Sequence, residues 1–418
     1  MMDLPLTLAA TGGHTATTTG DTQAIQPILP LGQGNREVDG LYVHIPFCFH
    51  KCHYCDFYSI ADPSGLKPDD RLATANRHAD FVARLIGELK HRSVQMRLRP
   101  RTIFAGGGTP TLLSPDLWRL FLAALHRIMD FRAVQEFTVE ANPETVTPTL
   151  LEVLAAGGVN RLSIGAQSFD PQLLKTLERW HDPANVGSAI KMARAAGIQN
   201  VNVDMIFAIP GQTLKKLDAD LDAVLALGPD HLSCYGLTYE PHTALTSRLG
   251  MGKIVPLDEE FERQMYDRVM TRLDTAGFEQ YEISNWARPN RRCQHNLAYW
   301  HNQNWLAVGP SAASHIDGYR WKNKAHLGQY LSHWPEPPTT DHEHLSPPDR
   351  VGEQLMLKLR LREGVKRKWL LDHLSDDDRR HGSIADMVQI GLLEWVDVRL
   401  RLTRRGLFVA DSVIGKLL

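Results

Sequence analysis

The sequence predicts an α/β fold: a partial (β/α)6 TIM-like barrel followed by a small C-terminal winged-helix-like α+β domain. Two observations support this prediction. Between residues 39 and 238, short apolar runs alternate with longer segments of helical periodicity, which is the pattern of repeated β-α units and a parallel sheet. After residue 348 the pattern changes to three helical segments and a hairpin. A length of 418 residues suits a large domain with an appendage.

Residues 1–38 are predicted to be a disordered Thr/Gly-rich tail. The first Lys or Arg is Arg36, whereas a secretory signal needs a basic start and a transit peptide needs arginines. No apolar stretch approaches the roughly 18 residues that span a bilayer. We therefore expect a cytoplasmic protein.

Residues 39–238 are predicted to form the barrel core. Six runs rich in β-branched and aromatic residues predict strands; they begin at Gly40, Thr102, Glu136, Arg161, Val201 and His231. Helical spacing of Leu, Ala, Val and Met predicts helices between them, among others at 78–97, 115–129, 183–196 and 213–227. In such barrels the chemistry lies on loops at the carboxyl ends of the strands.

The remainder of the chain divides into three parts. Residues 239–334 are expected to extend the barrel. Residues 335–348 contain five prolines in fourteen positions, which predicts a linker. Residues 349–418 are expected to hold helices near 350–361, 366–374 and 383–390, two short strands within 394–402 and a closing helix. From residue 350 on, 14 basic residues face 10 acidic ones, and the whole chain has a net charge of -2, so no nucleic-acid partner is expected.

Three of the five cysteines, Cys48, Cys52 and Cys55, lie within eight positions after the first predicted strand. A structural zinc site needs four ligands, usually as two pairs, and Cys234 and Cys293 are single and remote. Three thiolates from one tight loop suit three irons of a [4Fe-4S] cluster instead. The fourth iron is then open to an exogenous ligand.

The cysteine spacing, followed by Asp56 and Phe57, resembles the radical S-adenosylmethionine (SAM) superfamily. There, the open iron binds the amino and carboxylate groups of SAM, and one-electron reduction cleaves SAM to a 5'-deoxyadenosyl radical. Three segments narrow the resemblance to the oxygen-independent coproporphyrinogen III oxidase-like family, which includes HemW-like heme chaperones. They are His-Ile-Pro-Phe-Cys at 44–48, Gly-Gly-Gly-Thr-Pro-Thr at 106–111 and Asp-Met-Ile-Phe-Ala-Ile-Pro-Gly-Gln-Thr at 204–213.

The strand-end residues fit a SAM site. The glycines at 106–108 lack side chains, so their backbone can approach a ligand and present amide groups to a carboxylate. The resemblance implies that eight residues contact SAM: Tyr42, Gly107, Gly108, Thr109, Glu140, Gln167, Arg179 and Asp204. In the oxidase, Gln167, Arg179 and Asp204 correspond to contacts with a second SAM. Taken singly, each polar side chain could instead make a structural hydrogen bond, and Arg179 could lie on the surface of the helix after the fourth strand.

Two features bear on the choice between oxidase and chaperone. The oxidase motif has a fourth cysteine where this chain has Phe57, which argues against oxidase activity. His-Asn-Leu-Ala-Tyr-Trp at 295–300 matches the HNxxYW motif of the HemW group, which is associated with heme binding. His295 is therefore a candidate axial ligand flanked by flat aromatic faces. The alternative is an aromatic core segment with a hydrogen-bonded His295, and Cys293 is either a second iron ligand or a buried thiol.

The resemblance favours a heme chaperone that carries a [4Fe-4S] cluster, SAM and heme. Its expected partners are a heme acceptor in the cytoplasm or at the inner membrane and a reductant such as flavodoxin or ferredoxin. Two alternatives stay open. One is a radical SAM enzyme acting on a porphyrin, either the oxidase or a related C-methyltransferase. The other is a scaffold whose cluster is structural.

Overall fold

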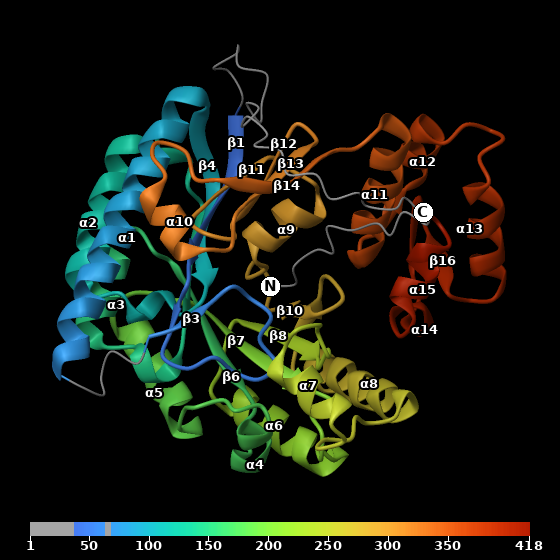
Figure 1. Cartoon of the computed structure of the whole chain (residues 1–418). Coiled ribbons are helices and arrows are strands. Elements are labelled where there is room, and N and C mark those ends of the chain that lie inside the picture. Colours follow the sequence, from blue (N-terminus) through green and yellow to red (C-terminus); the bar gives the residue numbers. More distant parts are fainter. Residues whose placement is uncertain (1–36, 63–67) are drawn as a thin grey trace.

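The computed structural model describes residues 37–62 and 68–418 (Figure 1). Positions 1–36 of the predicted tail at 1–38 therefore lie outside the described residues. Among the described residues, no helix is both long and apolar enough to cross a membrane.

Six parallel strands form the centre of the molecule and lie side by side in chain order, which confirms the predicted fold class. They are β1 (Glu37–Ile45), β4 (Arg97–Gly107), β5 (Glu136–Ala141), β6 (Arg161–Gln167), β7 (Asn200–Phe207) and β8 (His231–Gly236). Because the strands are parallel, their carboxyl ends meet at one edge of the sheet.

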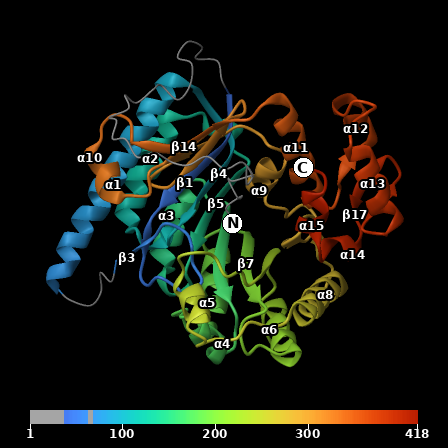
Figure 2. The ribbon, with the colours of Figure 1, turned by 45° about the vertical axis from the view of Figure 1, so that its right-hand side comes forward.

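Helices cover the outer face of this sheet (Figures 1 and 2). They are α1 (Pro68–Gln95), α2 (Pro115–Ile128), α3 (Pro148–Ala156), α4 (Pro171–Thr176), α5 (Pro183–Ala195) and α6 (Leu214–Ala226). Helices α2 to α5 all begin with a Ser, Thr or Asp cap followed by proline. The cap side chain accepts a free backbone N–H, and proline fits the first helical position, so each start is locally encoded.

The sheet continues on both sides of the core. After α7 (Ala244–Gly250) and α8 (Glu259–Thr275), β9 (Glu279–Gln280) and β10 (Asn285–Ala287) extend it beside β8. On the other side lie β11 (Trp305–Val308), parallel to β1, then β12 (Ala313–Ile316), β13 (Tyr319–Asn323) and β14 (Thr339–His344). The sheet ends at β14 and β9, which do not pair. The barrel is therefore partial.

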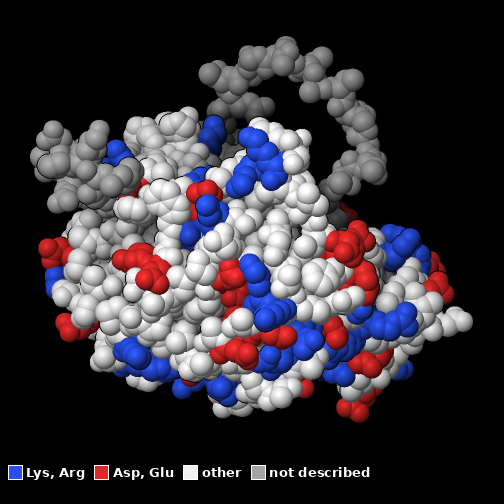
Figure 3. Space-filling view, turned by 90° about the horizontal axis from the view of Figure 1, so that it is seen from below, with Lys and Arg blue, Asp and Glu red and all other residues white. Residues whose placement is uncertain are grey.

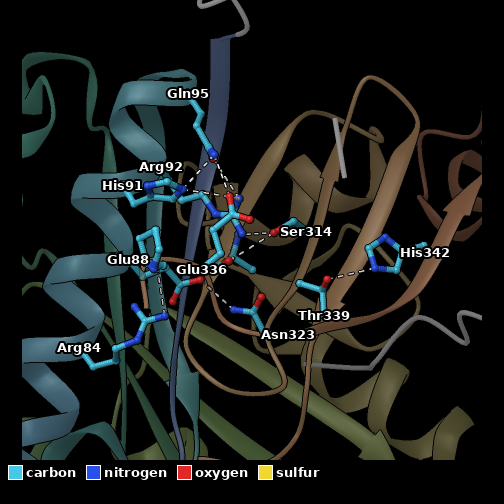
Figure 4. A network of polar contacts seen from close by, with 12 residues as sticks. Arg84, Glu88, His91, Arg92, Gln95, Ser314, Asn323, Glu336, Thr339 and His342 are labelled. Carbon is cyan, nitrogen blue, oxygen red and sulfur yellow. Dashed lines mark hydrogen bonds and ion pairs between the residues drawn. The ribbon is translucent and has the colours of Figure 1, made fainter. Parts of the chain in front are cut away.

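The predicted linker at 335–348 is wrong in part, because β14 lies within it and pairs with β13. Proline disrupts central strands but is tolerated beside a short edge strand, so the five prolines do not prevent pairing. Glu336 also holds the segment to α1, since its carboxylate accepts hydrogen bonds from Gln95 (2.8 Å) and Arg92 (3.3 Å) (Figure 4). The stretch is thus part of the barrel wall.

A buried carboxylate fastens α1 to the same wall. Glu88 is fully buried and accepts hydrogen bonds from the Gly309 amide (3.0 Å), the Asn323 side chain (2.9 Å) and the Tyr330 hydroxyl (2.7 Å). Tyr330 belongs to α10 (Leu327–Ser332). The first helix and the late strands therefore form one unit.

The C-terminal part lies to one side of the barrel (Figures 1 and 2). Its helices α11 (Pro347–Arg360), α12 (Arg367–His373) and α13 (Arg380–Gln389) lie close to their predicted positions. Strands β15 (Val365–Lys366), β17 (Arg399–Leu402) and β16 (Leu393–Val396) form its sheet in that order. Two short helices, α14 (Arg404–Leu407) and α15 (Ala410–Gly415), take the place of the single predicted closing helix.

Acidic and basic side chains intermingle on the face shown in Figure 3, with no broad area of one sign. This distribution agrees with the nearly neutral composition and offers no extended basic surface on that face.

Candidate functional site

A cavity of about 1020 Å³ lies at the carboxyl ends of the parallel strands. Ten of the twelve residues predicted for the site line it: Cys48, Cys52, Cys55, Gly107, Gly108, Thr109, Glu140, Gln167, Arg179 and Asp204. The parallel arrangement brings these residues together from six separate loops and strands. Tyr42 and His295 do not line the cavity.

Cys48 ends β2 (Phe47–Cys48), and Cys52 and Cys55 follow in the loop that leads to β3 (Ile60–Ala61), which pairs with β2. Cys48 Sγ accepts a hydrogen bond from the Thr109 hydroxyl at 3.6 Å, and Cys52 Sγ accepts one from the Arg179 guanidinium at 3.8 Å. Such donors stabilise thiolate sulfur. Burial raises the pKa of Cys55 to about 12, so ligation of any metal by this thiol would release its proton.

No three His, Cys, Asp or Glu side chains of the described residues converge on a point that could hold a single metal ion. In a [4Fe-4S] cluster each cysteine binds a different iron, so the sulfurs need only surround one common space. All three cysteines line the same cavity.

The glycine run has a different role from the one expected. The amide of Gly107 donates to Glu140 (3.1 Å), and the amide of Gly108 donates to the Ile45 carbonyl (2.8 Å). Neither amide is therefore free for a ligand carboxylate, and the prediction on this point is wrong. A Cβ atom at Gly108 would lie 2.6 Å from the Phe47 carbonyl oxygen. The glycines thus let the cysteine loop lie directly against the end of β4.

Two carboxylates face the cavity from β5 and β7, the strands on either side of β6. Desolvation by burial raises the pKa of Glu140 to about 7, and the nearby charge of Asp204 acts in the same direction. Asp204 is held by Asn202 (2.7 Å) and by the hydroxyl of Ser163 (3.2 Å). The cavity therefore carries acidic groups that a cationic ligand would stabilise in their charged form.

Gln167 and Arg179 take positions that the strand pattern alone could not show. Gln167 ends β6 at a register shift and has a φ of 67°, a conformation that is rare for a residue other than glycine and that directs its side chain into the cavity. Arg179 is not a surface residue, because its Nη2 donates to the Gly165 carbonyl at 2.8 Å and its side chain lines the cavity.

Tyr42 lies behind the cavity wall. Its ring packs on Phe104, and its hydroxyl lies 3.3 Å from Nδ1 of His44. A Cβ atom at Gly107 would lie 2.4 Å from the His44 ring. Tyr42 therefore supports the site through His44 in this arrangement.

His295 is fully buried on α9 (Gln294–Trp300). Its Nδ1 lies 2.8 Å from the Thr102 hydroxyl and its Nε2 lies 2.9 Å from the Tyr299 hydroxyl. Burial lowers its pKa to about 3, so the ring is neutral and shares one proton between these two contacts. With both ring nitrogens engaged, His295 is not free to bind iron in this arrangement, and it ties α9 to β4.

The two remaining cysteines and the last residue of the HNxxYW motif lie in different surroundings. Cys293 and Cys234 are buried, as expected of interior thiols, and Cys293 Sγ lies 3.4 Å from Glu136. Trp300, at the end of the motif, is half-buried, and the Arg360 guanidinium lies over its ring at 5.9 Å. Arg360 lines the cavity. The motif therefore reaches the cavity through Trp300 and Arg360.

Several lining residues were not predicted. Tyr235 is the last but one residue of the sixth core strand, β8, and the two-residue period of that strand could have placed it beside the predicted site. Lys322, His342, Arg360 and Asp411 come from β13, β14, α11 and α15. No sequence signal relates these late segments to the cysteine loop, because only long-range packing brings them to the cavity.

This fold and cavity define a radical SAM protein with a second domain of the HemN C-terminal type. Residues 42–224 match the model of the radical SAM superfamily, and residues 345–409 match that of the HemN C-terminal domain. The chain is similar in structure to coproporphyrinogen III oxidase (HemN) from Escherichia coli. The TM-score is 0.75 at 20% identity, covering 92% of this chain and 91% of the other, so the two proteins share the fold.

Two relatives extend the similarity over nearly the whole chain. The heme chaperone HemW of Mycobacterium tuberculosis (strain ATCC 25618 / H37Rv) is 35% identical over 383 residues, which are 91% of this chain and 94% of the relative. The heme chaperone HemW of Bacillus subtilis (strain 168) is 33% identical over 382 residues, covering 90% and 98%. The chain belongs to the HemW family.

Proposed function

We propose that this protein is a heme chaperone that holds a SAM-ligated [4Fe-4S] cluster, binds heme and transfers the heme to an acceptor protein. The observation that carries the proposal is the single cavity of about 1020 Å³, which contains the three cysteines and extends well beyond them. Cavities for one drug-sized ligand measure about 300–1,000 Å³. A cavity at the upper end of that range leaves room for a second ligand beside SAM.

The residues present fit the cluster. Cys48, Cys52 and Cys55 would each hold one iron, and the Thr109 and Arg179 donors would bond to the coordinated sulfurs. When bound, the cluster supplies one-electron reduction, for which flavodoxin or ferredoxin is the proposed donor. The chain itself contributes the thiols, the hydrogen bonds to them and the enclosure.

The residues also fit SAM, which carries a sulfonium and an amino group. Glu140 and Asp204 would attract these positive charges, while Gln167 and Arg179 offer polar contacts from the adjacent strand end. The glycines at 106–108 would let the ligand and the cysteine loop approach the end of β4. These assignments rest on the radical SAM motifs together with the shared cavity.

Phe57 is the residue that favours a chaperone over an enzyme that oxidises a porphyrin. Its side chain lines the cavity at the position of the fourth cysteine of the oxidase motif. An apolar ring there cannot supply a thiol for that reaction. We therefore propose that heme is carried without chemical change and is handed to an acceptor in the cytoplasm or at the inner membrane.

The test uses the full chain, reconstituted anaerobically with iron and sulfide. Titration with hemin should saturate at about one heme per chain, since proteins hold few such sites. The same preparation, supplied with SAM, reductant and coproporphyrinogen III, should form no protoporphyrinogen IX. Stoichiometric formation of that product would replace the chaperone by an oxidase, and absence of hemin binding would end the proposal.

A further inference from the structure

The cavity has an outer wall that none of the radical SAM motifs includes. This outer wall consists of Lys322, Asp341, His342, Glu343, Arg360 and Asp411. It comes from β13, β14, α11 and α15, and not from the parallel strand ends that carry the motif residues. Its chemistry is therefore available to a second ligand.

A β-bulge shapes this wall. On β13, Arg320 pairs with Glu343 and Lys322 pairs with Thr340, so one residue on β13 faces two on β14. Asp341, one of those two, has a φ of 53°. Bulges of this kind redirect side chains and are frequent beside functional sites. Here the bulge presents His342 to the cavity.

His342 differs from His295 in its exposure and in the hydrogen bonds of its ring nitrogens. It is exposed, and its Nε2 lies 3.1 Å from the Thr339 hydroxyl on the same strand (Figure 4). Its Nδ1 has no hydrogen-bond partner among the described residues. An imidazole with a free nitrogen at a cavity wall can serve as an axial iron ligand, whereas both ring nitrogens of His295 are engaged in this arrangement.

Lys322 supplies an unpaired positive charge beside this histidine. Its side chain is half-buried and lines the cavity, and within the described ranges no carboxylate lies at ion-pair distance from it. Burial lowers the pKa of His44 to about 4, and the ammonium group of Lys322 acts in the same direction, so the lysine charge is felt inside the site. Arg360, by contrast, pairs with Asp411 at 2.5 Å.

We propose that the outer wall is the heme site, with the His342 imidazole as an axial ligand of the iron and the Lys322 ammonium group as the partner of a propionate carboxylate. This inference rests on the proposed function and gives it a location. It also gives the HNxxYW segment a role at the site, since Trp300 supports the outer wall beneath Arg360 while His295 holds α9 in place.

The test titrates the full-length chain and its variants with three probes: hemin, iron-free protoporphyrin IX and hemin dimethyl ester, which lacks free carboxylates. His342→Ala should weaken hemin binding by about tenfold or more and shift the Soret band, because an iron ligand is lost. Its affinity for protoporphyrin IX should stay unchanged. His373→Ala, which removes an exposed imidazole on α12 outside the cavity, is the matched control and should bind all three probes normally.

Lys322→Gln should weaken hemin and protoporphyrin IX by about tenfold, the loss of one charge-assisted hydrogen bond, and should leave the dimethyl ester unaffected. SAM also carries a carboxylate, so SAM affinity is measured on the same variant. A loss confined to SAM would assign Lys322 to that ligand and overturn its heme role. Circular dichroism and thermal unfolding confirm that both variants are folded.

The outcomes separate this inference from the proposed function. If the unaltered chain binds hemin and His342→Ala binds it with the same affinity and spectrum, the location is wrong and the chaperone proposal stands. A change of the Soret band in His295→Ala but not in His342→Ala, with both variants folded, would show that the axial ligand of the iron is His295 on α9. If the unaltered chain binds none of the probes, the function itself fails.

Discussion

Nε2 of His44 lies 2.8 Å from the carbonyl oxygen of Tyr58, and these two residues flank the loop that carries the three cysteines. Burial lowers the pKa of His44 to about 4, so at neutral pH the ring is uncharged and its Nε2–H donates to the carbonyl. The Tyr58 hydroxyl in turn accepts the amide of Leu327 at 2.7 Å. The contact closes the loop and ties it to α10.

His44→Ala should therefore loosen the cysteine loop. Leaving the Tyr58 carbonyl without its donor costs about 1–3 kcal/mol, and a mobile loop holds three irons less well. We expect a lower melting temperature and a reduced iron and sulfide content after anaerobic reconstitution. Normal iron content in a folded His44→Ala protein would show that the loop is held by other contacts.

Cys52→Ala should abolish the iron and sulfide content, since two remaining thiols cannot retain the proposed cluster. Cys234→Ala is the control, because Cys234 is buried outside the cavity and its loss should leave the iron content unchanged. Iron and sulfide are measured chemically and by the absorption of the cluster. A cluster that persists in Cys52→Ala would refute the ligand assignment.

Gly108→Ala tests the close approach of the cysteine loop to β4. The added methyl group would lie 2.6 Å from the Phe47 carbonyl oxygen, and such overpacking costs about 1–3 kcal/mol. Melting temperature and iron content should both fall. Gly382→Ala adds a methyl group that meets nothing within 4 Å in a helix, so its melting temperature should stay the same or rise. Equal behaviour of the two variants would contradict the packing argument.

Glu140 should make SAM binding depend on pH. Burial raises its pKa to about 7, so the carboxyl is mostly protonated at pH 6 and mostly charged at pH 8. Since the charged form attracts the cationic ligand, SAM affinity of the cluster-loaded protein should rise about tenfold between these values. Glu140→Gln should lose that rise, and the titration of SAM itself is common to both proteins. Identical pH profiles would remove Glu140 from the SAM site.

Acid should destabilise the fold through its buried neutral histidines. Burial lowers the pKa of His295 to about 3 and that of His315 to about 4, whereas an unfolded imidazole titrates near 6.5. Below about pH 6.5 the unfolded chain binds more protons, so the stability present above that pH is lost as the pH falls toward the folded values. Urea unfolding from pH 7.5 to 5 should show this loss.

His295→Gln isolates one of these protons. The variant is expected to be less stable at pH 7.5, because its contacts with Thr102 and Tyr299 change. Its stability should also fall less steeply with acid, by about 1.4 kcal/mol per pH unit for one proton. An unchanged slope would mean that His295 is protonated in the folded protein or already neutral in the unfolded one.

Local patterns in the sequence were enough to predict the central strands, and the motifs named ten of the residues that line the cavity. Each core strand is indicated by its own run of apolar residues. Each of the helices α2 to α5 is indicated by its capping residue and the proline that follows it. The three cysteines occupy a single loop. Residues such as Glu140 and Asp204 could be assigned to one site because parallel strands end at a common edge, which requires no knowledge of side-chain contacts.

Only the tertiary structure decided which strands extend the sheet beyond β1. It also decided which donor and ligand atoms of the site residues are left without a hydrogen bond. The parallel pairing of β11 with β1 joins segments more than 260 residues apart, and no local signal encodes it. That pairing carries β13 and β14 to the cavity and with them Lys322 and His342. It equally decided that the Gly107 amide is already bonded to Glu140 and that His295 is enclosed by Thr102 and Tyr299. The sequence gives the chemical groups of each residue. Whether a donor or ligand atom remains free depends on its neighbours, and those are set by long-range packing.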